Sequence, residues 1–182
     1  MKIKNLSIFA IICSLLFSSV EAKADKTLTQ TGDILQVAIP VAGFARATYL
    51  KDYEGQKEFM YTLFANIVIT HGLKYSTKGS KIDKRPNGKS GSFPSGHTNS
   101  AFQGAFFLNT RYGYSYGIPA IGLAALTGYS RVDAKQHHVH DVLAGAAIAF
   151  AVNYFLVKEY EDRALTVHAS KDSFSLQLKM DL

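Results

Sequence analysis

The chain has 182 residues, of which 47% are hydrophobic and 19% are charged. This length supports one hydrophobic core and excludes two ordinary domains. The formal net charge of +6 gives the chain an affinity for anionic partners, among which nucleic acids, membrane surfaces and phosphorylated molecules must be separated.

The N-terminal segment has the features of a secretory signal peptide. Lys2 and Lys4 precede an apolar run over residues 6–20, and small residues follow at Ala22 and Ala24. A basic start, a short apolar stretch and small residues at the cleavage position are typical of such peptides. We predict cleavage after Ala22 or Ala24, and the alternative is an uncleaved helix that anchors the protein.

The predicted domain organisation follows from this segment. Residues 1–22 form the signal peptide, and residues 23–182 form one domain in the periplasm or an equivalent exported location, where it can associate with a membrane. The only cysteine, Cys13, lies in the signal peptide, so the mature chain forms no disulfides and depends on packing for its stability.

Apolar segments of helical length fill most of the mature chain. They are rich in Ala, Leu and Phe, and they cover residues 34–50, 59–73, 95–109, 116–129 and 137–157. These segments predict an all-α fold, a compact bundle of about five core helices. Near the C-terminus apolar and polar residues alternate on both sides of residues 170–173, which predicts a short β-hairpin; a frayed tail is the alternative.

Polar residues interrupt the helical segments. A membrane span needs about 20 consecutive apolar residues, and the first three segments contain Arg46, Asn66, His71, Asn99 and Gln103. The interruptions favour a water-soluble or surface-seated bundle. The last segment is the most membrane-like. If the helices did span the membrane in alternation, four segments would emerge on the same side. These are the loop before residue 95, the start of the third helix, the end of the fourth helix near residue 129 and the start of the last helix.

Positive charge gathers in one loop. This basic loop, residues 74–91, also contains several turn-forming Gly and Pro residues. Its charged residues are six cations and a single acid: Lys74, Lys78, Lys81, Asp83, Lys84, Arg85 and Lys89. Such a loop can bind a membrane surface or a phosphate group. Nucleic-acid binding is disfavoured because Tyr75 is the only aromatic residue available for stacking and no reader motif is present.

Three short motifs carry the chemistry of the chain. Lys78 is followed by Arg85-Pro86, then by Pro94-Ser95-Gly96-His97, and then by Ser130-Arg131 with His137 and Asp141 at fixed spacings behind them. This order and spacing resembles the three-part signature of the type 2 phosphatidic acid phosphatase superfamily, which also includes bacterial non-specific acid phosphatases and vanadium haloperoxidases. The resemblance implies an all-α bundle and a single phosphatase domain over residues 23–182.

The residue types suit a phosphate ester. Its transfer requires electrostatic stabilisation of negative charge more than covalent chemistry. Lys78, Arg85 and Arg131 supply three cations, two of them guanidinium groups that can grip two oxygens each. Ser95 and Gly96 open a helix, where backbone amides and the serine hydroxyl favour an anion. We expect all five residues to bind the substrate phosphate.

The resemblance assigns the reacting groups. It implies that His137 is the nucleophile and forms a phosphohistidine, and that His97 is the general acid and then the base that activates water. Asp141 lies one turn after His137 if both are on a helix, where it would accept a hydrogen bond from the imidazole. Ser130 receives no chemical role, and Asp133 is expected to cap the turn after Arg131.

Adjacent imidazoles leave a metal site as an alternative. His137, His138 and His140 are the residue types that zinc and copper prefer, but on a helix only His137 and His140 approach a shared face. We therefore expect no metal and no cofactor, with His138 and His140 at the rim of the site.

Two other functions stay open. A vanadate-dependent haloperoxidase would use the same cations and histidines, although this chain is short for that branch of the superfamily. A non-catalytic module could instead hold phospholipids through the basic loop. Substrates compatible with the site are soluble phosphomonoesters, phosphatidic acid, phosphatidylglycerol phosphate, polyprenyl pyrophosphates and the phosphates of lipid A. The compact chain favours a lipid-linked phosphate. No sequence feature indicates the oligomeric state.

Overall fold

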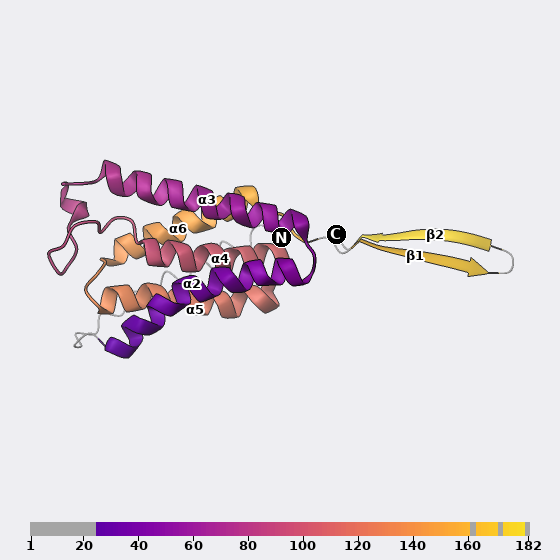
Figure 1. The fold of residues 1–182 in the computed structure, drawn as a ribbon, viewed down its shortest axis with the longest axis horizontal. Helices are drawn as coiled ribbons and strands as arrows, with labels where there is room; N and C mark the ends of the chain where they lie inside the picture. Colours follow the sequence, from indigo (N-terminus) through magenta and orange to yellow (C-terminus); the bar gives the residue numbers. More distant parts are fainter. Residues whose placement is uncertain (1–24, 161–162, 171–172, 181–182) are drawn as a thin grey trace.

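A computed structural model describes residues 25–160, 163–170 and 173–180; the predicted signal peptide lies outside them. The described chain forms an all-α bundle with one C-terminal hairpin, which confirms the predicted fold class (Figure 1). The elements are α2 (Lys26–Tyr49), α3 (Tyr53–Ser76), the short 3-10 helix η1 (Lys81–Asp83), α4 (Gly96–Tyr112), α5 (Tyr114–Asp133), α6 (Val139–Leu156), β1 (Arg163–Ser170) and β2 (Ser173–Met180).

Polar caps extend two helices beyond the apolar segments that predict them. Helix α2 begins at Lys26 rather than residue 34, because the side chain of Asp25 accepts a hydrogen bond from the amide of Thr27. Helix α3 begins after Asp52, whose carboxylate accepts from the amide of Gly55. A capping side chain satisfies backbone donors in the first turn, so the helix starts before its apolar stripe.

Helix α4 is the centre of the bundle. It contacts α2, α3, α5 and α6, and most of its residues are buried, with Phe102 and Phe107 fully enclosed. Gly104 lets α2 approach, since a Cβ there would lie 2.5 Å from the backbone nitrogen of Pro40. The helix that carries the Ser-Gly-His motif is therefore held on all sides.

The polar interruptions of the helices point inward. The side-chain amide of Asn99 donates to Asn66 Oδ1 at 2.7 Å, and Gln103 donates to the hydroxyl of Thr62 at 2.9 Å. These buried hydrogen bonds join α3 to α4. Polar groups at these positions thus satisfy one another inside the bundle.

Large apolar side chains cover much of the outer surface instead. They line the outer faces of four helices: Ile34, Val37 and Val41 on α2, Phe64, Ile67 and Val68 on α3, Ile118, Leu123 and Leu126 on α5, and Tyr154, Phe155 and Leu156 on α6. Among the described residues, α6 is the one helix that is long and apolar enough to cross a membrane. The bundle is therefore apolar on much of its outer surface, and its hydrophobic core also contains buried polar side chains.

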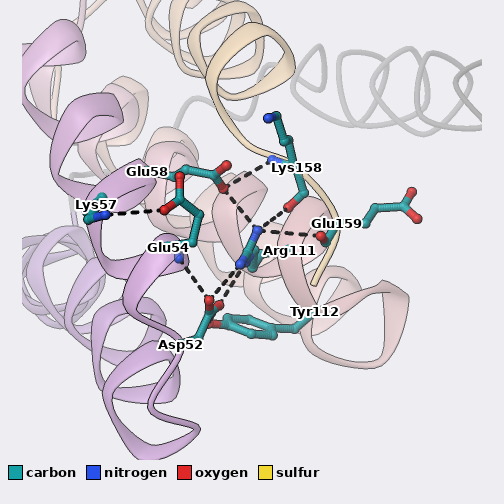
Figure 2. Close-up of polar contacts among 9 residues, drawn as sticks. Asp52, Glu54, Lys57, Glu58, Arg111, Tyr112, Lys158 and Glu159 are labelled. Atoms are coloured by element: carbon teal, nitrogen blue, oxygen red, sulfur yellow. Dashed lines mark hydrogen bonds and ion pairs between the residues drawn. The ribbon is translucent and has the colours of Figure 1, made fainter. Parts of the chain in front are cut away.

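An ionic cluster closes the end of the bundle from which the hairpin extends (Figure 2). Arg111, near the end of α4, binds both oxygens of Asp52 at 2.6 and 2.8 Å and one oxygen of Glu58 at 3.2 Å. It also donates to the carbonyls of Lys158 and Glu159. One guanidinium group thereby connects α4, the start of α3 and the chain after α6.

The C-terminal strands pair in the segment where alternation predicts a hairpin. β1 runs antiparallel to β2, with Arg163 opposite Met180 and Ser170 opposite Ser173. The hairpin extends from the end of the bundle opposite the basic loop (Figure 1).

Candidate active site

The segments that carry the motifs meet at one end of the bundle (Figure 1). The amide of Ser95 donates to the carbonyl of Asp141 at 2.9 Å, which joins the start of α4 to the first turn of α6. Gly145 permits this contact, because a Cβ there would lie 2.5 Å from the carbonyl oxygen of Ser95. The amide of Asn87, in the basic loop, donates to the carbonyl of Lys135 after α5.

His137 lies in the connection between α5 and α6, before the helix and not on it. Helix α6 begins at Val139 with His138 as its N-cap, which corrects the predicted start at residue 137. The amide of His137 donates to the carbonyl of Arg131 at 3.2 Å, and the residue is only 2% exposed. A backbone bond therefore joins this connection to the end of α5.

Asp141 holds this turn together. Its Oδ2 accepts hydrogen bonds from the hydroxyl of Ser92 at 2.6 Å and from the amide of His138 at 2.8 Å, while Nε2 of His140 lies 3.2 Å from Oδ1. Nδ1 of His137 is 3.7 Å from Oδ2, too far for the predicted hydrogen bond. The hydrogen bonds of the carboxylate go to Ser92 and the backbone, so it acts on the imidazole only through its charge.

The environment of His137 favours the neutral imidazole. Burial lowers the pKa of His137 below its ordinary value, and the charges of Arg85 and Lys74 lower it further, against the opposing effect of Asp141. Burial disfavours the charged form of histidine, as nearby cations do. A neutral ring nitrogen is the form that can act as a nucleophile.

The start of α4 differs in detail from the expected phosphate cradle. Ser95 is the N-cap, and its hydroxyl accepts from the amide of Thr98 and pairs with the Thr98 hydroxyl at 2.9 Å. Because its own amide is bonded to Asp141, Ser95 is engaged within the protein at both groups. The amides of Gly96 and His97 remain at the open first turn, and a Cβ on Gly96 would meet no described atom within 4 Å.

Arg131 is fully buried and anchored by helix α2. Its Nη1 lies 2.6 Å from Oδ1 of Asp33, its Nη2 donates to the carbonyl of Thr29 at 2.5 Å, and its Nε donates to the hydroxyl of Ser130 at 3.0 Å. Ser130, to which the sequence assigns no chemical role, therefore orients the guanidinium group.

His97 contacts the same carboxylate. Its Nε2 lies 3.1 Å from Oδ1 of Asp33, and about a third of its side chain is exposed. His97 and His137 are close enough to interact electrostatically. Two motif residues from different helices, His97 and Arg131, thus share one oxygen of an aspartate on a third helix.

The acid in the basic loop organises the loop. Asp83 accepts hydrogen bonds from the amides of Gly79 and Gly91, which lower the pKa of its carboxyl group. The carbonyl of Gly91 in turn accepts from Nζ of Lys74 at 2.8 Å and from Nη2 of Arg85 at 3.3 Å. Both cations are held beside His137, on whose pKa they act.

The remaining motif residues lie at the rim. Lys78 is exposed in the turn after α3. His138 and His140 stack with ring centroids 5.1 Å apart, and Nε2 of His138 lies 3.0 Å from the carbonyl of Lys84. These two rings share a face, which corrects the predicted pairing of His137 with His140. Asp133 accepts from the amide of Asp25 instead of capping its own turn.

Sequence reasoning misses three residues of this site. Asp33 is far in sequence from the residues it touches, Ser92 stands just before the Ser-Gly-His motif, and Lys74 is one cation among six in the basic loop. The position of Ser92 beside the motif is the one local signal. Asp33 and Lys74 become recognisable only through their contacts.

Comparisons with known proteins identify a family. Residues 48–164 match the family described as the PAP2 superfamily. The chain is 31% identical over 148 residues to the lipid A 4′-phosphatase of Helicobacter pylori (strain J99), across 75% of this chain and 72% of that protein. It is 39% identical over 90 residues to the lipid A 1-phosphatase of Porphyromonas gingivalis, across 47% of this chain and 20% of that longer protein.

A solved structure is also similar. It is the crystal structure of a transmembrane PAP2-type phosphatidylglycerolphosphate phosphatase from Bacillus subtilis, which aligns with a TM-score of 0.42 and 21% identity over 85% of this chain and 92% of that chain.

Proposed function

This chain belongs to the PAP2 superfamily and is a phosphatase, and we propose that it releases phosphate from a lipid through a phosphohistidine intermediate on His137. The observation that carries the proposal is the meeting of His137, His97 and Arg131 beside the open first turn of α4. A nucleophile, an acid and a fixed cation around one anion site are the groups that phosphoryl transfer requires.

The first half of the reaction forms the phosphoenzyme. Nδ1 of His137 faces Asp141, so Nε2 attacks phosphorus as the bond between phosphorus and the leaving oxygen breaks. His97 donates a proton to that oxygen, which departs as an alcohol. Arg131, Arg85 and the amides of Gly96 and His97 hold the phosphoryl oxygens, where fixed donors stabilise the charge of the transition state.

The second half releases phosphate. His97, now neutral, takes a proton from water, and the hydroxide attacks phosphorus while the bond to His137 breaks. The imidazole returns to its starting form and inorganic phosphate leaves. Positive charge in every step comes from Arg131 and Arg85, with Lys74 beside Arg85, so the proposed reaction needs no metal ion.

The outer surface of the bundle supports a lipid substrate. Apolar side chains on four helices would contact acyl chains, and the inward polar groups of Asn66, Asn99 and Gln103 would be shielded from them, as in membrane helices. We infer that the bundle is seated in a membrane with its site at one surface. Because two relatives are lipid A phosphatases and the 4′-phosphatase aligns over most of both chains, the proposed substrate is the 4′-phosphate of lipid A.

The test is phosphate release by the purified protein in mixed micelles. Lipid A bearing both phosphates, lipid A bearing one, phosphatidic acid, phosphatidylglycerol phosphate and a soluble phosphomonoester are compared, each with chelator present. We expect release from the 4′ position of lipid A, unaffected by the chelator. A preference for the soluble ester contradicts the lipid assignment, and a loss of activity with chelator contradicts the metal-free reaction.

The variant His137→Ala tests the nucleophile. It removes the only group assigned to attack phosphorus, so we expect no detectable release and no acid-labile phosphoenzyme after rapid quenching. Asp141→Asn is the comparison variant. The native Asp141 carboxylate lies 3.7 Å from the His137 ring, so its removal should lower phosphate release less than His137→Ala does. Residual turnover by His137→Ala close to that of the wild type would refute the phosphohistidine.

A further inference from the structure

One carboxylate on α2 holds two residues of the reaction. Oδ1 of Asp33 lies 2.6 Å from Nη1 of Arg131 and 3.1 Å from Nε2 of His97. Both contacts are within hydrogen-bonding distance. The three side chains come from α2, α5 and α4, so this oxygen is where the phosphate-binding arginine and the proposed general acid are fixed relative to each other.

Helix α2 reaches this position because of a glycine. A Cβ on Gly32 would lie 2.0 Å from Oγ of Ser130 and 2.8 Å from Nη2 of Arg131. No side chain fits in that space, so α2 packs directly against the Ser130-Arg131 pair, and the carbonyl of Thr29 reaches Nη2. The contact is a feature of the helix packing and not of one flexible side chain.

The anchoring leaves Arg131 partly available. Arginine has five N–H donors, and three of them are bonded to Ser130 Oγ, Asp33 Oδ1 and Thr29 O. One hydrogen remains on each terminal nitrogen. Donors on two neighbouring nitrogens can bind two oxygens of a phosphate.

The same contact determines how His97 transfers protons. An ionised carboxylate only accepts hydrogen bonds, so Nε2 of His97 carries its hydrogen in both protonation states of the ring. Nδ1 is then the nitrogen that gains and loses the proton. A carboxylate that fixes one imidazole nitrogen in this way sets the tautomer and orientation of the other.

We propose that Asp33 is a positioning residue for the reaction: it fixes Nε2–H of His97 and one edge of Arg131, so that Nδ1 of His97 transfers the proton and the remaining donors of Arg131 hold the phosphoryl group. This inference rests on the proposed phosphatase function. The groups that face His97 are Asp33 from α2, Arg131 from α5 and His137 from the α5–α6 connection.

The variant Asp33→Asn tests the proposal through turnover and phosphate affinity together. Loss of the carboxylate lets the ring adopt the wrong tautomer, so we expect kcat to fall about 10- to 100-fold, the range found when the partner of a metal-bound imidazole is removed. Inhibition by inorganic phosphate or vanadate should weaken as well, because Arg131 loses the contact that fixes one edge of its guanidinium group.

The leaving group separates the two contacts of Asp33. For lipid A the departing sugar oxygen requires a proton, whereas the phenolate of an alkylphenyl phosphate in the same micelles leaves more easily without one. If Asp33 acts through His97, the loss in kcat is smaller for the alkylphenyl phosphate. Equal losses on both substrates would overturn the role through His97.

Matched variants keep the result interpretable. Asp133→Asn removes another carboxylate that joins α5 to α2, through the amide of Asp25 at 3.0 Å, and should leave kcat unchanged. Asp33→Ala, with the thermal unfolding midpoint measured, guards against compensation by the Asn side chain. Wild-type turnover in both Asp33 variants overturns the proposal, and unchanged inhibition by inorganic phosphate or vanadate overturns the role through Arg131. Failure of the wild type to release phosphate would instead refute the proposed function.

Discussion

The charge state of His137 is set by groups from several parts of the chain. Burial lowers its pKa first, Arg85 and Lys74 lower it further, and Asp141 raises it. The free imidazole titrates with a pKa of about 6.5, so the buried ring stays neutral to a lower pH than a free histidine. The proposed nucleophile therefore needs no dedicated base to be neutral at neutral pH.

The neighbours of His137 should move the acidic limb of kcat/KM in opposite directions. This limb reports ionisations of the free enzyme and substrate, and the substrate contribution is the same for every variant. Removing the carboxylate in Asp141→Asn should shift the limb to lower pH, because the group that raises the pKa of His137 is lost. Removing a cation in Lys74→Gln should shift it to higher pH.

The measurement is the initial rate of phosphate release at low substrate concentration between roughly pH 4.5 and 8, a range that includes the ordinary histidine pKa of about 6.5. Lys57→Gln, which neutralises an exposed lysine paired with Glu54 on the outer surface of α3, is the control and should not move the limb. Shifts of the same sign in both site variants would show that another group controls the limb.

At the scale of the elements, α4 is fixed at both ends by different means. Its first turn is joined to α6 by the bond from Ser95 to Asp141, and its last turn carries Arg111, whose contacts are shown in Figure 2. Burial raises the pKa of Asp52, but the hydrogen bonds from Arg111 and the amide of Gly55 outweigh it and leave the pKa below the ordinary value. The ionised carboxylate is therefore the form that stabilises the fold.

Replacing Arg111 with Met should destabilise the bundle strongly. The substitution leaves Asp52 and Glu58 buried without their cation, and breaking a buried ion pair from one side costs about 3–5 kcal/mol. Thermal unfolding in detergent measures the effect as a lower midpoint. Lys57→Ala breaks an exposed pair with Glu54, 3.4 Å long, and should change stability by at most about 1 kcal/mol. Similar midpoints for the two variants would contradict a central role for Arg111.

For the whole molecule, the distribution of side chains predicts how the protein meets the membrane. Apolar residues surround the bundle while the basic loop and the site occupy one end. With residues 1–22 acting as an export signal, that end would face the periplasm, where substrates in the outer leaflet are accessible. The opposite end carries the Arg111 cluster and the hairpin.

Cysteine labelling tests this orientation cleanly, because Cys13 is the only natural cysteine. In a Cys13→Ser background, Ser90→Cys places a thiol in the basic loop and Ser115→Cys places one at the other end, both at exposed positions. We expect a membrane-impermeant maleimide to label Ser90→Cys in cells with a permeabilised outer membrane, and Ser115→Cys only after lysis. Release of the protein from membranes by salt alone would refute the embedded bundle.

The sequence by itself determined the fold class and the family. Five apolar segments specified the helices because apolar periodicity reflects which face is buried, and the spacing of the three motifs was fixed enough to identify the superfamily. The same periodicity could not distinguish an interior from a lipid-facing surface. In the sequence, Asn66 and Gln103 interrupt apolar segments. In the structure, each points toward the helix that carries the other, and the sequence could not predict this because it does not show which way a polar side chain points.

Only the tertiary structure decided how the candidate site is held together. The motif spacing named His97, Arg131, His137 and Asp141, but it placed His137 on a helix that begins two residues later. It contained no sign of Asp33, which lies 98 residues from Arg131. A contact across that separation exists only because α2 packs against α5 at Gly32, and such packing depends on the fit of whole helices and not on any local pattern.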